Sequence, residues 1–314
     1  MGRVTNIFIK EEEHSMNIHM KQLISIILVV TLVLAAEMAK ADFIFGTPTN
    51  LGPMVNSSAN EGSPNISADG LELYFNSNRP GGSGGNDLWV STRATTDDEW
   101  GEAVNLGPLV NSSAAEGGPT ISHDGLTLYF HDWGAPRPGG QGKSDLWVTT
   151  RATKDDAWGE PVNLGPTINS PEQDGTPVIS ADGLELYFES DRPGGFGIDD
   201  LLVTKRATTQ DDWGTPVNLG STVNSADWEH CANISSDGLT LFFDLGVPGD
   251  LMVTTRATLD DDWGEPVNLG HAESDHYASC ISADGATLYF ASKRPGGSGG
   301  NDIWQVPILP SRGL

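Results

Sequence analysis

Acidic side chains recur at one position of a repeated sequence pattern. They stand five residues before each copy of an Ile-Ser pair, and a histidine replaces the acid in the last copy: Glu61, Glu116, Asp174, Glu229 and His276. Carboxylates held close together raise one another's pKa or recruit a cation. Such a group of residues could bind a ligand or a divalent cation, although each acid could instead pair with an arginine of a nearby loop.

Aromatic and histidine side chains interrupt the repeat in three of its copies. The residues concerned are Trp133, Trp228, His230 and Tyr277. Repeats that only support a fold have no reason to acquire such side chains on loops, which often carry binding sites. Tryptophan can stack on the apolar face of a sugar ring, while carboxylates accept its hydroxyl groups. We therefore predict a ligand site formed by these residues and the recurring acids.

Two cysteines stand close to this predicted site. Cys231 and Cys280 precede the repeated isoleucine by three and by one residue, in neighbouring copies. An exported protein permits a disulfide, but the two-residue offset makes the distance between the Cα atoms uncertain. The sequence leaves open whether the two thiols are joined.

Five copies of one repeat must position these residues. The segment ISADGLELYF at Ile66–Phe75 recurs at four later places: Ile121–Phe130, Ile179–Phe188, Ile234–Phe243 and Ile281–Phe290. Asp-Gly between two apolar runs predicts a hairpin turn. A Gly-rich loop, a third strand and a fourth strand containing Val-Asn-Leu-Gly follow in each complete copy. Four antiparallel strands in every repeat of roughly 50 residues predict the blade of a β-propeller.

The two ends of the repeat region predict a closed ring. The last copy stops after its third strand at Gln305–Val306, while Phe45–Gly52 (FGTPTNLG) matches the fourth strand of the other copies. The N-terminal strand can therefore complete the last blade, which leaves no open sheet edge. We predict an all-β, five-bladed propeller over residues 42–314 that is a monomer, with the acids around one mouth of its central channel. The alternative is a larger ring assembled from several chains.

Arginines after the second strand predict a repeated ion pair. Arg79 ends that strand in the first copy and Asp87 begins the third strand, so the two can meet across the Gly-rich loop. Arginine binds carboxylates in a favourable forked geometry. We therefore predict an Arg79–Asp87 pair, with equivalent pairs in two further copies.

The repeat also resembles a known family. ISADGLELYF followed by NSNRPGGSGGNDLWV is similar to the TolB-like, WD-repeat-like propeller repeat of exported bacterial proteins, whose core reads S-P-D-G…F-x-S-x-R…D-I/L-W/Y. The resemblance covers residues 43–306, with Ala, His or Ser in place of the proline before Asp-Gly. It implies a propeller fold and leaves the function open, because that family includes assembly proteins, propellers attached to peptidases and lyases.

Two classes of function fit these residues, and a pure scaffold is the third possibility. The first is non-catalytic binding of a glycan, peptide or protein ligand, since the sequence has no H-E-x-x-H zinc motif and its near-identical repeats show little specialisation. The alternative is a glycan-cleaving enzyme, either a glycosidase that uses two of the recurring carboxylates or a metal-dependent lyase that uses His230 and His276. We predict the binding function and no cofactor, apart from a divalent cation that the channel mouth could hold.

The N-terminus has the features of an export signal. An apolar run, Leu23–Ala36, follows Lys21 and precedes an A-x-A cleavage pattern at Ala39–Ala41. We predict a signal peptide over residues 1–41, with Met16 or Met20 as alternative starts, and a secreted or periplasmic protein without a membrane span after cleavage. The formal net charge of −26 argues against nucleic-acid partners, which require clustered Lys and Arg.

Overall fold

The structure is a computed structural model that describes residues 44–134, 137–246, 249–269 and 276–309. Every regular element in these ranges is a β-strand, and none of the described residues belong to a helix long and apolar enough to cross a membrane. The predicted signal peptide, with the alternative starts Met16 and Met20, lies outside the described residues. The side chains of His276 and Tyr277 also lie outside them, although their backbone is part of a strand.

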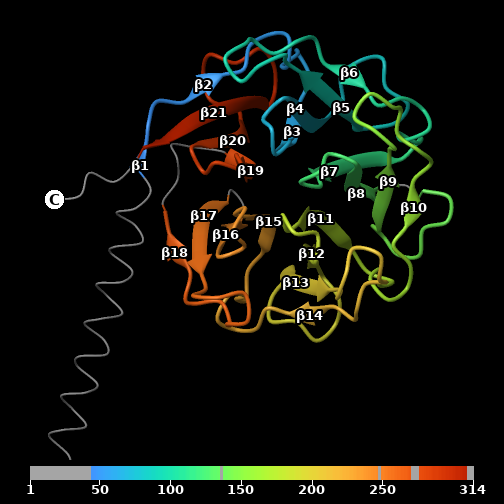
Figure 1. The fold of residues 1–314 in the computed structure, drawn as a ribbon, viewed down its shortest axis with the longest axis vertical. Helices are drawn as coiled ribbons and strands as arrows, with labels where there is room; N and C mark the ends of the chain where they lie inside the picture. Colours follow the sequence, from blue (N-terminus) through green and yellow to red (C-terminus); the bar gives the residue numbers. More distant parts are fainter. Residues whose placement is uncertain (1–43, 135–136, 247–248, 270–275, 310–314) are drawn as a thin grey trace, which may run out of the picture. The chain divides into compact units, whose positions relative to one another are not determined.

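Residues 45–309 form one compact unit in which antiparallel sheets surround a common axis (Figure 1). Four of the sheets are built from four consecutive strands, each paired with the next. These are blade 1 with β3 (Glu61–Ile66), β4 (Glu72–Ser77), β5 (Asp87–Thr92) and β6 (Val104–Asn105); blade 2 with β7 (Ala115–Ile121), β8 (Thr127–Trp133), β9 (Leu146–Thr150) and β10 (Val162–Asn163); blade 3 with β11 (Asp174–Ile179), β12 (Glu185–Ser190), β13 (Asp200–Lys205) and β14 (Val217–Asn218); and blade 4 with β15 (Glu229–Ile234), β16 (Thr240–Leu245), β17 (Asp250–Thr255) and β18 (Val267–Asn268).

Blade 5 joins the two ends of the chain. It contains β19 (His276–Ile281), β20 (Thr287–Ser292) and β21 (Asp302–Leu309), and β21 pairs with the N-terminal strands β1 (Ile44–Phe45) and β2 (Thr49–Asn50). Asn50 lies opposite Trp304, as Asn105 lies opposite Trp89 in blade 1. The predicted five-bladed propeller, closed by its N-terminal strand, is therefore confirmed.

Side chains of the second strand of each blade fill the space between blades. Leu73 and Phe75 are fully buried on β4, and so are their equivalents in other blades. The tyrosine between them meets a tryptophan that follows the third strand of a neighbouring blade, and the ring centroids of Tyr74 and Trp158 are 6.1 Å apart in edge-to-face geometry. Burying one such large side chain contributes about 1.5–3 kcal/mol, so repeated apolar positions hold neighbouring blades together.

The inner strands, which are β3, β7, β11, β15 and β19, line the centre, and each contacts the inner strands of both neighbouring blades. Each has a bulge at the same register, where one residue adopts a positive φ between 39° and 53°: Ser63, Gly118, Thr176, Cys231 and Ala278. These bulges narrow the channel, since the cavity that they surround has a volume of only about 30 Å³. The axis of the propeller is thus nearly filled by protein.

Candidate functional site

The four recurring acids are buried beneath the loops at one end of the channel. We call Glu61, Glu116, Asp174 and Glu229 the acid ring, and their side chains are 0% exposed. Three of them pair with an arginine that follows the second strand of the same blade: Arg79 Nη2 lies 3.0 Å from Glu61 Oε1, Arg137 Nη1 3.6 Å from Glu116 Oε1, and Arg192 Nη2 2.5 Å from Asp174 Oδ1. For these three acids the geometry therefore favours the alternative interpretation, in which the acid is the partner of an arginine.

Serines of the preceding loop and of the second strand complete the surroundings of these acids. The Ser57 hydroxyl and backbone N–H donate to the two oxygens of Glu61, and the Ser77 hydroxyl donates to Oε1. Glu229 also accepts a hydrogen bond from a serine hydroxyl, that of Ser225 at 2.5 Å, but no ion pair forms with it among the described residues. Burial raises the pKa of Glu229, although hydrogen bonds from Ser225 oppose the shift.

The predicted Arg79–Asp87 pair is wrong. Arg79 reaches inward to Glu61 and lies over the rings of Phe75 and Trp89, at 5.2 and 5.0 Å. Asp87 instead accepts hydrogen bonds from the backbone N–H groups of Ser83 and Gly84, and from the Asn105 side chain. The Gly-rich loop folds back over the start of β5, so its own N–H groups satisfy the carboxylate.

The aromatic candidates lie at different blades. Trp133 of blade 2 stacks on His131, with ring centroids 5.1 Å apart. Trp228 precedes β15 and forms an isolated bridge with Asp199 of blade 3, and its side chain is half-buried. His230 lies on β15, where Nε2 is 3.1 Å from the carbonyl oxygen of Gly246. The structure thus places Trp228 and His230 near the junction of blades 3 and 4, and Trp133 on blade 2.

A cluster of possible metal ligands lies at the junction of blades 3 and 4. Ligand atoms of Glu189, His230 and Cys231 all lie within 4.8 Å of one another, and His230 Nδ1 is 3.3 Å from Cys231 Sγ. Thiolate, imidazole and carboxylate are the ligands that Zn²⁺ prefers.

The sequence left open whether Cys231 and Cys280 form a disulfide. In the structure both are free thiols.

Sequence reasoning did not select Glu189. The residue occupies a position of the second strand that differs in every blade: Asn76, His131, Glu189, Asp244 and Ala291. That variability directly after a phenylalanine that all five copies share is the signal that could have identified it. Burial raises the pKa of Asp244 to about 7, with His230 opposing the shift. Burial and the nearby Glu189 raise the pKa of Asp199 to about 6.

These variable side chains connect successive blades. Three of them accept a hydrogen bond from the backbone N–H of the positive-φ residue in the next blade: Thr176 donates to His131 Nδ1 at 3.1 Å, Cys231 to Glu189 Oε2 at 3.1 Å and Ala278 to Asp244 Oδ2 at 2.9 Å. A histidine can accept at Nδ1 only in its neutral form. Consistent with this, burial lowers the pKa of His131 to about 4.

Replacing His131 with asparagine is expected to reduce the loss of stability on acidification. Because the pKa of His131 falls from 6.5 to about 4 on folding, only the unfolded chain binds a proton between these values, and the stability of the natural protein decreases as the pH falls through this window. Asparagine keeps an acceptor for the Thr176 N–H without a titrating ring. Thermal unfolding between pH 4 and 7.5 should give a steeper decrease in Tm for the natural protein, whereas parallel profiles would contradict the assignment.

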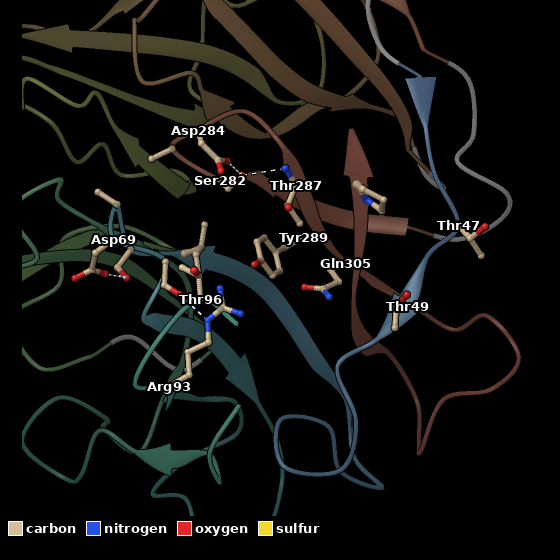
Figure 2. A pocket seen from close by; sticks show the side chains of 16 residues that line it. Thr47, Thr49, Asp69, Arg93, Thr96, Ser282, Asp284, Thr287, Tyr289 and Gln305 are labelled. Atoms are coloured by element: carbon tan, nitrogen blue, oxygen red, sulfur yellow. Dashed lines mark hydrogen bonds between the residues drawn. The ribbon is translucent and has the colours of Figure 1, made fainter. Parts of the chain in front are cut away.

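An open cleft lies between blades 5 and 1, on the side of the hairpin turns and away from the acid ring. Its volume is about 490 Å³, within the usual range for small-molecule sites. Figure 2 shows Arg93 and Tyr289 at the cleft, with Asp69 and Asp284 on two turns beside it. Burial raises the pKa of Tyr289, and the nearby Arg93 opposes that shift. The sequence analysis did not include these residues in the predicted site. Each stands at a position that recurs in several copies of the repeat, and such recurrence indicates a structural role.

Comparison with known proteins supports the fold and goes no further. No family model matches the chain, and no curated protein matches it. Similar solved structures include an α-L-arabinofuranosidase from Podospora anserina in complex with cellotriose (TM-score 0.57, 13% identity, 87% of this chain and 99% of that one) and an α-L-arabinofuranosidase from Lactobacillus brevis (TM-score 0.57, 14% identity, 83% and 95%). TolB from Acinetobacter baumannii is also similar (TM-score 0.51, 13% identity, 82% of this chain), and this chain spans 56% of its length. The TolB-like propeller fold is confirmed.

Proposed function

We propose that this protein is an exported, monomeric, non-catalytic propeller that binds a glycan, peptide or protein ligand. The observation that supports the proposal is the state of the acid ring, whose members are 0% exposed and mostly paired with arginines. A glycosidase needs two carboxyl groups that flank a bound sugar, and buried, paired carboxylates do not contact a substrate. The strong negative charge favours a ligand other than nucleic acid.

A glycan-cleaving enzyme is the second candidate, and one observation favours it. Asp199 has a pKa raised to about 6 and lies near Glu189 and His230, and a carboxyl group with a raised pKa is what a general acid requires. Several similar structures are also named as glycoside-cleaving proteins, which gives this alternative the same fold-level support. In that case Asp199 and Glu189, outside the acid ring, would act on the substrate.

A glycan array combined with a reducing-sugar assay separates the two functions. For a binding module we expect retention of one glycan class by residues 42–314 and no release of reducing ends from that glycan. Release of reducing ends that disappears in the Asp199→Asn variant, but persists in the Glu229→Gln variant, would replace the binding function with the enzymatic one.

We also propose that a divalent cation would bind at the junction of blades 3 and 4, with Glu189, His230 and Cys231 as its ligands. Their ligand atoms lie within 4.8 Å of one another, and the contact of His230 Nε2 with the Gly246 carbonyl leaves Nδ1 available as a ligand. Addition of Zn²⁺ is expected to raise Tm, and the Cys231→Ser variant should lose that increase. Equal increases in Tm for both proteins would show that Zn²⁺ binds elsewhere.

A further inference from the structure

An arginine at the end of the third strand is held in the same way in four blades. Its Nε donates to the carbonyl oxygen of a glycine in the hairpin turn of its own blade at 2.8 Å. Its guanidinium lies over the tryptophan that follows, at 4.2 to 4.6 Å from the ring centroid. The four residues are Arg93, Arg151, Arg206 and Arg256. This shared geometry directs the rest of each guanidinium toward the preceding blade.

At two blade junctions this arginine meets a glutamate of the preceding blade. Arg151 Nη2 lies 2.6 Å from Glu72 Oε2, and Arg256 Nη2 lies 2.7 Å from Glu185 Oε2. A tyrosine hydroxyl donates to the same carboxylate oxygen, since Tyr187 reaches Glu185 Oε2 at 2.8 Å and Tyr74 approaches Glu72 in the same way. At both junctions the propeller thus binds a carboxylate with one guanidinium and one phenol, and at Glu185 the Lys205 Nζ adds a contact of 2.6 Å to Oε1.

At two other junctions the glutamate is replaced by threonine. Thr287 stands where Glu72 stands in blade 1, and it faces Arg93; Thr127 takes the same place and faces Arg206. Within the described part of the chain neither Arg93 nor Arg206 forms an ion pair. The tyrosine is retained in both cases, as Tyr289 and Tyr129.

Clefts occur at both of these junctions. The Arg93 cleft, between blades 5 and 1, has a volume of about 490 Å³. The Arg206 cleft, between blades 2 and 3, has a volume of about 360 Å³. Each is lined by the arginine, the tyrosine and the threonine in equivalent positions, and Figure 2 shows the first of them. Two half-buried guanidinium groups, each hydrogen-bonded to the tyrosine of its cleft, therefore border open space at the place where a carboxylate is bound elsewhere in the same molecule.

We propose that the Arg93 and Arg206 clefts are two equivalent subsites for the carboxylate of an acidic sugar. The carboxylate of the ligand takes the position that Glu72 and Glu185 occupy in the other junctions, where the arginine and the tyrosine hydroxyl both contact it. This inference rests on the proposed binding function and names its ligand class.

The rest of the lining favours a uronic acid over an acidic peptide. Beside its single arginine, the Arg93 cleft carries two aspartates, Asp69 and Asp284, together with neutral groups such as Thr96 and Gln305. Carboxylates and amides accept hydrogen bonds from sugar hydroxyls, whereas the carboxylates repel the further negative charges of an acidic peptide. The net charge of −26 also disfavours a polyanion. A sugar unit with one carboxylate and several hydroxyls matches this combination.

Variants in which the protein supplies its own carboxylate to each cleft test the proposal. Thr287→Glu and Thr127→Glu each place a carboxylate opposite an arginine that has none, as Glu185 already stands opposite Arg256, so we expect both variants to fold. Titration of residues 42–314 with glucuronate, followed calorimetrically, should give two sites, with one site in each variant and none in the double variant. Loss of a charge-assisted contact to arginine should weaken binding at the filled cleft by about ten- to a hundredfold.

Matched controls make the result specific. Thr240→Glu introduces the same side chain in blade 4, where Ile308 of the next blade stands in place of the arginine, and it should leave both sites intact. Glucose should bind at least tenfold more weakly than glucuronate. Unchanged glucuronate binding in the double variant, or binding of a glutamate-rich peptide without binding of glucuronate, would overturn the inference. Retention of a neutral glycan on the array with no effect of the double variant would overturn it while leaving the binding function standing.

Discussion

The Glu61→Gln variant is expected to lose about 3–5 kcal/mol of folding stability, the usual cost of removing one partner of a buried ion pair. Glu61 is 0% exposed and its Oε1 lies 3.0 Å from Arg79 Nη2, whose side chain is 11% exposed. The amide keeps the size of the side chain but leaves the guanidinium buried without a negative charge. Urea unfolding at pH 7 measures the change in the free energy of unfolding.

Glu229→Gln is the matched control for this prediction. Glu229 occupies the equivalent position in blade 4, without an ion pair among the described residues, and burial raises its pKa. A carboxyl group with a raised pKa in the folded state stabilises less as the pH rises through that value. The amide should therefore be neutral or slightly stabilising at pH 7, and the stability of this variant should decrease less as the pH rises above 4.5. Equal losses for the two variants would show that the ion pair with Arg79 is not the reason for the loss of stability in Glu61→Gln.

The contrast between these two acids shows what the repeats could and could not predict. Asp-Gly turns and the Leu-x-Leu-Tyr-Phe pattern predict strands, blades and closure, because hairpin geometry and two-sided burial depend on local sequence. The partner of Arg79 does not follow from such rules, since Glu61 and Asp87 both lie at the same end of the blade. The path of the Gly-rich loop decides between them, because its N–H groups satisfy Asp87.

The Arg93 and Arg206 clefts could not be predicted from the sequence either. The exchange of Glu72 for Thr127 or Thr287 is visible in the aligned repeats, but it gains meaning only when the arginine of the next blade is seen to face that position. Similarly, Glu189 approaches Cys231 across a blade junction, through a positive-φ bulge. Sites between blades depend on the rotation of one sheet relative to the next, which a pattern within one repeat does not encode.

A chain that begins at Ser58 is expected to lose cooperative folding, because the N-terminal segment provides the outer strand of blade 5. Asn56 holds β21 through both of its amide atoms, with Nδ2 donating to the Ile303 carbonyl at 2.9 Å and Oδ1 accepting from the Ile303 N–H at 2.7 Å. Asn50 donates to Asp302 at 2.9 Å, and Val55 is 0% exposed. Removal of this N-terminal segment exposes the edge of β21 and the apolar side chains between blades 5 and 1. An open sheet edge favours aggregation.

Addition of a peptide with the sequence of residues 42–57 should restore the fold of this shortened chain, since a free strand can add to an exposed edge through backbone hydrogen bonds. Recovery of near-ultraviolet circular dichroism and of a single unfolding transition measures it. The same peptide with Asn50→Ala and Asn56→Ala should restore much less, because the contacts to Asp302 and Ile303 are then missing. A chain that begins at Asp42 should unfold at the same Tm as the uncut protein. If the shortened chain unfolds cooperatively without the peptide, blades 1 to 5 are stable as an open arc and closure serves another purpose than stability.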